Sequence, residues 1–325
     1  MSSFPAYRPR RLRRTPGLRR AFAETSLVPS NLVAPLFVKE GLSEPAPIES
    51  MPGQHQHTLE SLVKEAREIA GRGVAGFLLF GVPEHKDATG TQAWTRDGIV
   101  QRGLHALKDE LGDDVVVIAD LCLCEYTDHG HCGLLDGERV DNDRTIETYA
   151  DIAVSQAGAG ADVVAPSGMM DGQVAAIRTA LDDAGMRDAA ILAYAAKYAS
   201  SFYGPFRAAA EGAPRFGDRR SYQQDSPNVA EGVREAQLDV AEGADAVMVK
   251  PALGYLDVLR AVKEALGYPT AAYNVSGEYS MLMAAAQKGW IDERQAVLET
   301  LTCIRRAGAD LVITYHAKKA AEWLA

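Results

Sequence analysis

Three cysteines and two histidines lie within eleven consecutive residues, in the segment Cys122-Leu-Cys124-Glu-Tyr-Thr-Asp-His129-Gly-His131-Cys132. Thiolates are strong zinc ligands, and the glycine between the histidines lets the chain turn back so that the third cysteine approaches the first two. A lone cysteine would ordinarily be a buried core residue, but three thiols this close together favour a metal site. Three thiolates leave a fourth position for a substrate, as in catalytic zinc sites, unless His129 or His131 completes the shell or hydrogen-bonds to it from outside.

Two lysines follow apolar runs that are typical of buried strands. Lys250 comes directly after Ala246–Val249, and Lys197 comes shortly after Ala190–Tyr194. A lysine at a buried strand end is costly unless it is paired or its pKa falls, and a neutral amine can attack a ketone to form a Schiff base. The ordinary alternative is a lysine that reaches solvent from the rim. Two amines that face one cavity would each destabilise the other's charge, which favours two imines.

A long segment of about 50 residues separates the two lysines. It contains Arg207 and Arg219, and a guanidinium group binds a carboxylate through two parallel hydrogen bonds. The ordinary alternative is a pair of surface arginines. Because the segment is much longer than a normal barrel connection, we expect an active-site lid around residues 200–225.

The elements that must position these residues recur as a short apolar strand followed by an amphipathic helix. The expected strands are Leu32–Phe37, Val74–Phe80, Val115–Leu121, Asp162–Ala165, Ala190–Tyr194, Ala246–Val249, Thr270–Tyr273 and Leu311–Thr314. Near-continuous apolar runs favour parallel strands that are covered on both faces. Eight such units predict a TIM (β/α)8 barrel. An open doubly wound sheet is the alternative, but it would be expected to carry a glycine-rich phosphate loop after its first strand, where this chain has Val38-Lys-Glu-Gly41.

Active sites of such barrels form at the carboxyl ends of the strands. Polar residues follow the expected strands at six of the eight ends: Asp120 with the cysteines, Ser167, Lys197, Lys250, Ser276 and Tyr315. The hydroxyl groups of Ser276 and Tyr315 are neutral donors that suit a second carboxylate. The pattern therefore predicts one site at one mouth of the barrel.

The N-terminal residues differ in charge from the rest of the chain. Residues 1–20 contain seven arginines and no acidic residue, so the rest of the chain carries −17 within a total of −10. A basic arm suits nucleic acid, a transit peptide or a neighbouring subunit. No downstream segment resembles a nucleic-acid-reading motif, and Pro9 and Pro16 interrupt an amphipathic helix. We expect an arm over residues 1–30 that packs on a neighbouring copy, and a catalytic barrel over residues 31–325.

The composition is that of an ordinary globular protein. Of the 325 residues, 47% are hydrophobic and 24% are charged. No run of about 18 uncharged apolar residues occurs, and the start of the chain lacks the apolar region of a signal peptide. The clustered cysteines do not look like a secreted disulfide framework. We therefore expect a cytoplasmic protein without membrane or nucleic-acid partners.

Over essentially its full length, the chain resembles the porphobilinogen synthase family, also called δ-aminolevulinic acid dehydratase. The resemblance depends on many ordered blocks rather than on one motif. They are Arg8-Pro-Arg-Arg-Leu-Arg-Arg14, Asp120–Gly133, Ala165-Pro-Ser167 with Met169-Met-Asp-Gly172, Ala196-Lys197, Phe202-Tyr-Gly-Pro-Phe-Arg207, Phe216-Gly-Asp-Arg219-Arg-Ser-Tyr-Gln223, Met248-Val-Lys-Pro251, Val275-Ser-Gly-Glu278 and Arg306-Ala-Gly-Ala-Asp310.

The resemblance implies that two molecules of 5-aminolevulinate condense into a pyrrole with loss of two waters, an early step of tetrapyrrole and heme biosynthesis. It implies one imine on Lys250, with the substrate that supplies the propionate side of the product, and one on Lys197, with the other substrate. The resemblance also implies that Cys122, Cys124 and Cys132 hold a catalytic zinc and that Asp120 transfers protons. One substrate carboxylate would bind Arg207, Arg219 and Gln223, and the other would bind Ser276 and Tyr315. Tyr203 and Ser167 would make further contacts in the pocket.

The family also implies a homo-octamer whose arms wrap a neighbour, and in some members an activating magnesium on a glutamate that aligns with Glu235. This chain departs from many relatives at Gly168, where they have aspartate, and at Ala195, where they have a small hydroxyl residue. The same residues leave two rival hypotheses: a Schiff-base aldolase of another keto substrate, and a non-enzymatic zinc-stabilised scaffold. An aldolase needs one lysine and no thiolate-held metal, and a scaffold should unfold when zinc is removed.

Overall fold

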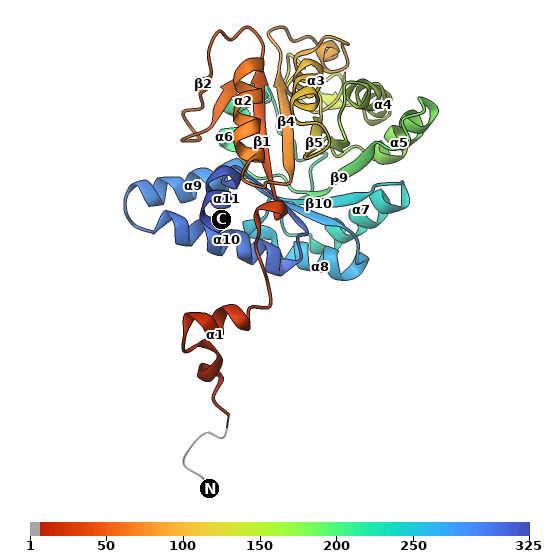
Figure 1. Ribbon diagram of the computed structural model, residues 1–325. Coiled ribbons are helices and arrows are strands. Elements are labelled where there is room, and N and C mark those ends of the chain that lie inside the picture. The colour runs from red at the N-terminus through yellow and green to blue at the C-terminus, as the bar shows by residue number, and fades with distance from the viewer. Residues whose placement is uncertain (1–6) are drawn as a thin grey trace.

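A computed structural model describes residues 7–325, and within them eight parallel strands close into a barrel (Figure 1). The ring closes through pairing of its last strand with its first, where Leu32 lies opposite Val312. The strands are β1 (Leu32–Lys39), β4 (Gly76–Val82), β5 (Val116–Leu121), β8 (Val163–Pro166), β9 (Ala190–Lys197), β10 (Ala246–Lys250), β11 (Thr270–Asn274) and β12 (Leu311–Thr314). Each contains or overlaps one of the expected apolar runs, so the predicted TIM barrel is confirmed.

Helices surround the barrel and cover the outer face of its strands (Figure 1). They are α2 (Leu59–Ala70), α3 (Ile99–Leu111), α4 (Asn142–Gly158), α5 (Gln173–Asp183), α7 (Val229–Ala241), α8 (Leu256–Leu266), α10 (Glu293–Ala307) and α11 (Ala317–Leu324), with α6 (Gly204–Ala209) and α9 (Ser276–Gln287) at strand ends. The expected caps are present in α2 and α8. The Thr58 hydroxyl accepts the Ser61 N–H at 3.1 Å, and Gly267 ends α8 in the left-handed region at φ 59°.

The recurring Gly-Ala-Asp segments each connect a helix to the next strand. Their aspartates accept a backbone N–H from the neighbouring strand: Asp162 from Val117 at 2.8 Å, Asp245 from Ile191 at 2.8 Å, and Asp310 from Thr270 at 2.9 Å. Each carboxylate therefore holds two adjacent strands together at the amino end of the barrel, opposite the expected site.

Apolar side chains form two clusters, one between strands and helices and one inside the barrel. The outer cluster includes Phe77, Leu79 and Leu104, and the inner cluster includes Leu78, Ile118 and Met248. Neighbouring residues on a strand enter different clusters because strand side chains alternate between faces. Aromatic side chains lie in the inner cluster, among them Phe80, Tyr194 and Tyr273.

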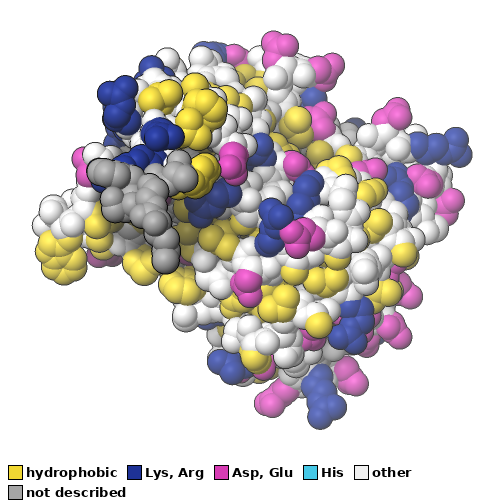
Figure 2. All heavy atoms as spheres, turned by 90° about the horizontal axis from the view of Figure 1, so that it is seen from below, with side chains coloured by type: hydrophobic (Ala, Val, Ile, Leu, Met, Phe, Trp, Pro, Cys, Tyr) yellow, Lys and Arg dark blue, Asp and Glu magenta, His cyan; other side chains and the backbone are white. Residues whose placement is uncertain are grey.

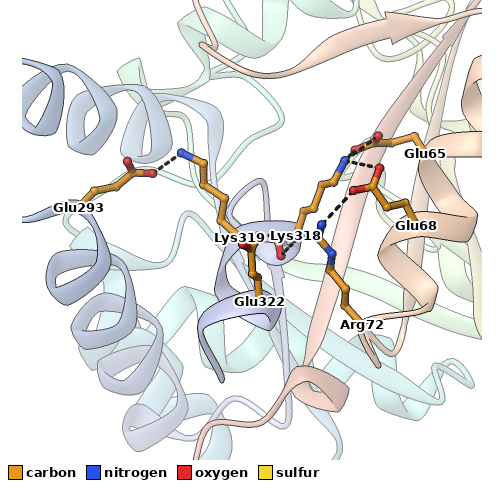
Figure 3. A network of polar contacts seen from close by, with 7 residues as sticks. All are labelled: Glu65, Glu68, Arg72, Glu293, Lys318, Lys319 and Glu322. Carbon is orange, nitrogen blue, oxygen red and sulfur yellow. Dashed lines mark hydrogen bonds and ion pairs between the residues drawn. The ribbon is translucent and has the colours of Figure 1, made fainter. Parts of the chain in front are cut away.

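A network of ion pairs joins α11 to α2 and to α10 (Figure 3). Lys318 lies 2.9 Å from Glu65 and 3.0 Å from Glu68, both on α2. Lys319 lies 2.6 Å from Glu293 on α10. These side chains are partly exposed, so each pair contributes little by itself, but together they tie α11 to both neighbours.

The arm extends away from the barrel (Figure 1). Its described part contains a 3-10 turn, Pro9–Arg13, and the short helix α1 (Pro16–Ala21). All seven arginines are exposed, as are Tyr7 and Phe22, and basic side chains gather beside the terminal residues in Figure 2. Residues 1–6 of the expected arm lie outside the described residues. Within residues 7–325, no helix combines the length and the apolar character needed to span a membrane.

Four short strands were not expected from the sequence. They are β2 (Ala46–Pro47), β3 (His55–His57), β6 (Leu135–Asp136) and β7 (Arg139–Val140). β3 pairs with the end of β1, where Gln56 lies opposite Phe37. Strands of two or three residues are too short to show a periodic apolar pattern, so sequence alone does not reveal them.

Candidate active site

The two lysines are direct neighbours in the barrel. Lys197 is the last residue of β9 and Lys250 the last residue of β10, and the strand register places them opposite each other. Lys197 is 4% exposed and Lys250 is 5% exposed. Their amines lie 5.5 Å and 5.0 Å from the centre of the same ring, that of Tyr194. Two buried amines therefore face one cavity.

Aromatic rings surround the amine of Lys250. Its Nζ lies 4.3 Å from the ring centre of Tyr273 and 5.3 Å from those of Tyr203 and Phe206. Burial, and then the charge of Lys197, lower the pKa of Lys250 to about 7. A substantial fraction of this lysine is therefore the neutral, nucleophilic amine near neutral pH.

A chain of contacts connects Lys197 to Asp120 through Ser167. The Lys197 amine donates to the carbonyl oxygen of Ser167, whose hydroxyl donates to Asp120 Oδ2 at 3.3 Å. Asp120 Oδ1 is buried and has no hydrogen-bond partner among the described residues. Burial raises the pKa of Asp120 well above its usual value, so the carboxyl group can hold a proton at this position.

The three cysteines of the segment after β5 come together. Their sulfur atoms lie within 4.8 Å of one another, and those of Cys122 and Cys124 are 3.5 Å apart. Tetrahedral zinc with Zn–S bonds of about 2.3 Å places its sulfurs about 3.8 Å apart, so this spacing fits zinc. Hydrogen bonds from the other two thiols hold the pKa of Cys132 well below its usual value, which favours one thiolate already.

Both histidines of the segment use their ring nitrogens for other bonds. His129 Nε2 lies 3.2 Å from the Ala88 carbonyl oxygen, and its Nδ1 accepts the His131 N–H at 3.1 Å. His131 Nδ1 lies 3.1 Å from the Tyr222 hydroxyl, and its Nε2 lies 3.1 Å from the Phe216 carbonyl oxygen. Of the alternatives for these histidines, the geometry favours support of the loop from outside a three-thiolate site.

The segment expected to form the lid packs on the cysteine loop. One guanidinium nitrogen of Arg219 donates to the carbonyl oxygens of Gly130 at 2.9 Å and Gly212 at 2.6 Å. A side chain at Gly130 would place its Cβ 2.3 Å from the Ala213 carbonyl oxygen, so this close approach requires glycine. Arg219 is thus a bridge between the loop and the lid.

Both lysines, Asp120, Ser167, Cys124 and Arg219 line one cavity. Its walls are Phe80, Asp120, Cys124, Glu125, Ser167, Lys197, Tyr203, Phe206, Arg207, Arg219 and Lys250. The free volume is about 10 Å³, enough for about one water molecule. Among the described residues, the buried Nε atoms of Arg207 and Arg219 and both carboxylate oxygens of Glu125 have no hydrogen-bond partner. Buried donors and acceptors without partners are suited to binding a polar ligand.

A family model described as delta-aminolevulinic acid dehydratase matches residues 6–323. The chain belongs to this family. Proteins named delta-aminolevulinic acid dehydratase from Streptomyces coelicolor and Mycobacterium tuberculosis are each 58% identical to it, with 99% and 100% of this chain and 98% and 99% of theirs covered. The crystal structure of the Toxoplasma gondii dehydratase in complex with the reaction product porphobilinogen is 46% identical, with a TM-score of 0.96 over 98% of this chain and 92% of that one.

Besides Cys122 and Cys132, four residues that the family resemblance assigns to ligands lie outside the walls of the cavity. The Ser276 hydroxyl accepts the Phe206 N–H at 3.0 Å and donates to the Phe202 carbonyl oxygen at 3.3 Å, so it holds the lid. The Tyr315 hydroxyl lies 2.9 Å from that of Tyr273, which packs on the Lys250 amine. Gln223 and Glu235 line a separate groove, in which Asp171 and Glu231 are further acids.

Sequence reasoning missed several residues of the cavity. Glu125 stands between metal-ligand candidates and does not stand out in the sequence, and its burial to 2% exposure is the signal that distinguishes it. Tyr194 and Tyr273 end two of the expected strands and belong to the barrel core, and their rings also contact Lys250. Nothing in the structure explains why Ala195 replaces a hydroxyl residue.

Proposed function

We propose that this chain condenses two molecules of 5-aminolevulinate into porphobilinogen in the strand-end cavity, with Lys197 and Lys250 as the imine-forming amines. The activity is that of the family, a dehydratase (a lyase) of heme and porphyrin biosynthesis. The observation that carries the residue assignment is the pair of buried amines in register beside the cysteine cluster. A colour assay for pyrrole formation, with metal content measured on the same sample, tests the proposed activity and its metal requirement.

The chemistry follows from the two amines. Each lysine attacks the ketone carbon of one substrate, a C=N bond replaces the C=O bond, and one water leaves. Carbon–carbon and carbon–nitrogen bonds then join the two substrates, and both lysines are released as free amines. Two waters are lost in total, and proton loss completes the aromatic ring. Asp120 Oδ1 is the buried acceptor and donor for these protons.

Zinc fits the three sulfur atoms, and when bound it supplies a Lewis acid that polarises a substrate oxygen. In this proposal Cys122, Cys124 and Cys132 hold it, at the end of β5. Cys124 is the member of the cluster that also lines the cavity, which supports a catalytic use of the metal.

Substrate carboxylates need cationic partners, and Arg207 and Arg219 line the cavity. We assign one carboxylate to these arginines with Gln223, whose buried amide atoms have no hydrogen-bond partner among the described residues, and the other to Ser276 and Tyr315, beside the Tyr273 ring. Gln223, Ser276 and Tyr315 lie outside the walls of the closed cavity, so these contacts require an opened lid. Tyr203 orients Lys250 through its ring, and Ser167 fixes Lys197. The acids Asp120 and Glu125 are the wall residues suited to substrate amino groups.

Entry of substrate requires movement, because the enclosed space holds about one water molecule. The segment around residues 200–225 provides four wall residues of the cavity, Tyr203, Phe206, Arg207 and Arg219, and packs on the cysteine loop. It is the lid in this proposal, and its opening admits both substrates.

The arm is assigned to assembly. Its exposed arginines and apolar side chains have the character of a docking segment, and the barrel carries a large negative charge. We propose a homo-octamer in the cytoplasm, in which each arm packs on a neighbouring barrel. Magnesium is assigned to the groove of Glu235, where burial and the charge of Asp171 raise the pKa of that carboxyl group.

The Arg207→Ala variant is expected to raise the Michaelis constant by about 10- to 100-fold, because a charged hydrogen bond to a carboxylate is lost. The kcat should change much less. Steady-state kinetics of the variant measures this, with Arg220→Ala, an exposed arginine of the same segment, as the control. An unchanged Michaelis constant in Arg207→Ala would contradict the carboxylate assignment.

Imine formation on Lys250 is expected to slow below neutral pH. Its pKa is lowered to about 7, so the neutral amine predominates above that pH and falls roughly tenfold per pH unit well below it. Borohydride trapping during a single turnover, at pH values from about 5.5 to 10, measures the rate. A rate that still rises steeply between pH 8 and 10 would indicate an amine with an ordinary pKa.

A further inference from the structure

The glycine at position 168 is a steric requirement. A Cβ on Gly168 would lie 1.8 Å from the hydroxyl oxygen of Tyr149 and 2.5 Å from the ring carbon that bears it. The next residue, Met169, is a non-glycine residue in the left-handed region, with φ 64°. The turn after β8 therefore passes tightly around the Tyr149 hydroxyl.

Tyr149 reaches the cysteine loop from helix α4. It lies on α4, is fully buried, and its hydroxyl donates to the Cys132 carbonyl oxygen at 2.5 Å. A phenol hydroxyl is protonated at physiological pH, so Tyr149 can donate this hydrogen bond.

A second residue of α4 holds the same stretch of loop. Thr145 lies one turn before Tyr149, on the same helix face, and its hydroxyl accepts the Leu134 N–H at 2.9 Å. The Cys132 N–H points to the Tyr222 hydroxyl at 3.5 Å, which is a weak contact. The bond from Tyr149 is thus the principal side-chain contact on the backbone of Cys132.

We propose that Tyr149 is a positioning residue for the thiolate site: its hydroxyl fixes Cys132 at ligand distance from the other two thiols, and Gly168 is the residue that leaves room for it. The inference rests on the proposed role of the cysteines as zinc ligands. It also connects that site to the lysines, because the residue before Gly168 accepts the bond from Lys197 and donates to Asp120.

The test is zinc affinity of the full-length protein without substrate, measured in competition with a chromophoric chelator. Tyr149→Phe removes the hydroxyl and keeps the ring, and should weaken zinc binding by about 10- to 100-fold, as loss of an outer hydrogen bond to a metal site does. Gly168→Ala should have a similar effect, because its Cβ displaces the hydroxyl. The zinc affinity of the double variant should match that of the weaker-binding single variant to within about threefold, since both changes break the same interaction.

Tyr268→Phe is the matched control. The Tyr268 hydroxyl also donates to a backbone carbonyl, that of Ala244 at 3.1 Å, but near the amino ends of the strands. The zinc affinity of Tyr268→Phe should equal that of the unmodified protein. The spectrum of the cobalt-substituted protein gives a second readout, because a displaced thiolate changes the sulfur-to-cobalt charge-transfer band.

Wild-type zinc affinity in Tyr149→Phe would overturn the proposal, and additive losses in the double variant would overturn the pairing with Gly168. If Gly168→Ala does not fold, the zinc affinity of Tyr149→Phe alone tests the proposal. Failure of the underlying assignment gives a different result: Cys124→Ala would then keep its zinc. Loss of zinc in Cys124→Ala together with unchanged affinity in Tyr149→Phe would count against the tyrosine only.

Discussion

Lys250→Ala is expected to lower kcat by a factor on the order of 10⁴ or more, since the variant has no amine at this strand end to form the imine. Initial rates of pyrrole formation measure the loss. The variant should keep its fold, because the aromatic rings around position 250 form an apolar lining and the cost of burying an amine disappears.

The matched control for this variant is Lys288→Ala. Lys288 also lies over an aromatic ring, with its amine 4.7 Å from the ring centre of Trp290, but it is exposed at the end of α9. Its removal should leave kcat unchanged. Turnover by Lys250→Ala at a rate comparable to the unmodified protein would overturn the assignment of this amine.

Cys124→Ala is expected to lose zinc and activity together. Two thiols remain, which is too few for a stable site, and loss of the Lewis acid should lower kcat by a factor on the order of 10³. Metal analysis and the pyrrole assay on the same preparation measure both effects. Thermal unfolding should show a folded protein, because a catalytic site, unlike a zinc finger, does not supply the core.

Cys303→Ala serves as the control, since Cys303 lies on α10, outside the cysteine cluster. It should retain both zinc and rate. A Cys124→Ala protein with full zinc content and little activity would show that the ligand set is different from the one assigned.

The barrel was predictable because its strands are continuous apolar runs and its helices carry a regular apolar face. The end of β10 was equally predictable, because a lysine directly after a buried run is unusual on physical grounds. The end of β9 was expected at Tyr194, but the strand continues to Lys197, and this extension puts the two lysines in register.

Other parts of the site were not predictable from the sequence. Tyr149 lies in a helix and Tyr273 in a strand, and their aromatic side chains have the pattern of ordinary core residues. Only three-dimensional packing shows that one hydroxyl reaches the Cys132 backbone and one ring the Lys250 amine. The same limit applied to Gly168, because its steric role depends on Tyr149, nineteen positions earlier in the chain.

The histidines of the cysteine segment illustrate a different limit. Spacing alone left two roles open for His131, because a ring nitrogen can either ligate zinc through its lone pair or donate an N–H to a carbonyl oxygen. The structure places a hydroxyl and a carbonyl oxygen at its two nitrogens. Contacts from residues 216 and 222, far along the chain, decide between the roles.

The central claim is that two amines form imines with substrate in one cavity beside a thiolate-held metal. The most direct test is borohydride reduction of the zinc-loaded protein during incubation with 5-aminolevulinate, followed by peptide mass mapping. The account predicts reduced substrate adducts on both Lys197 and Lys250. An unmodified protein, or adducts on a lysine outside the cavity such as Lys86 while these two remain free, would contradict it.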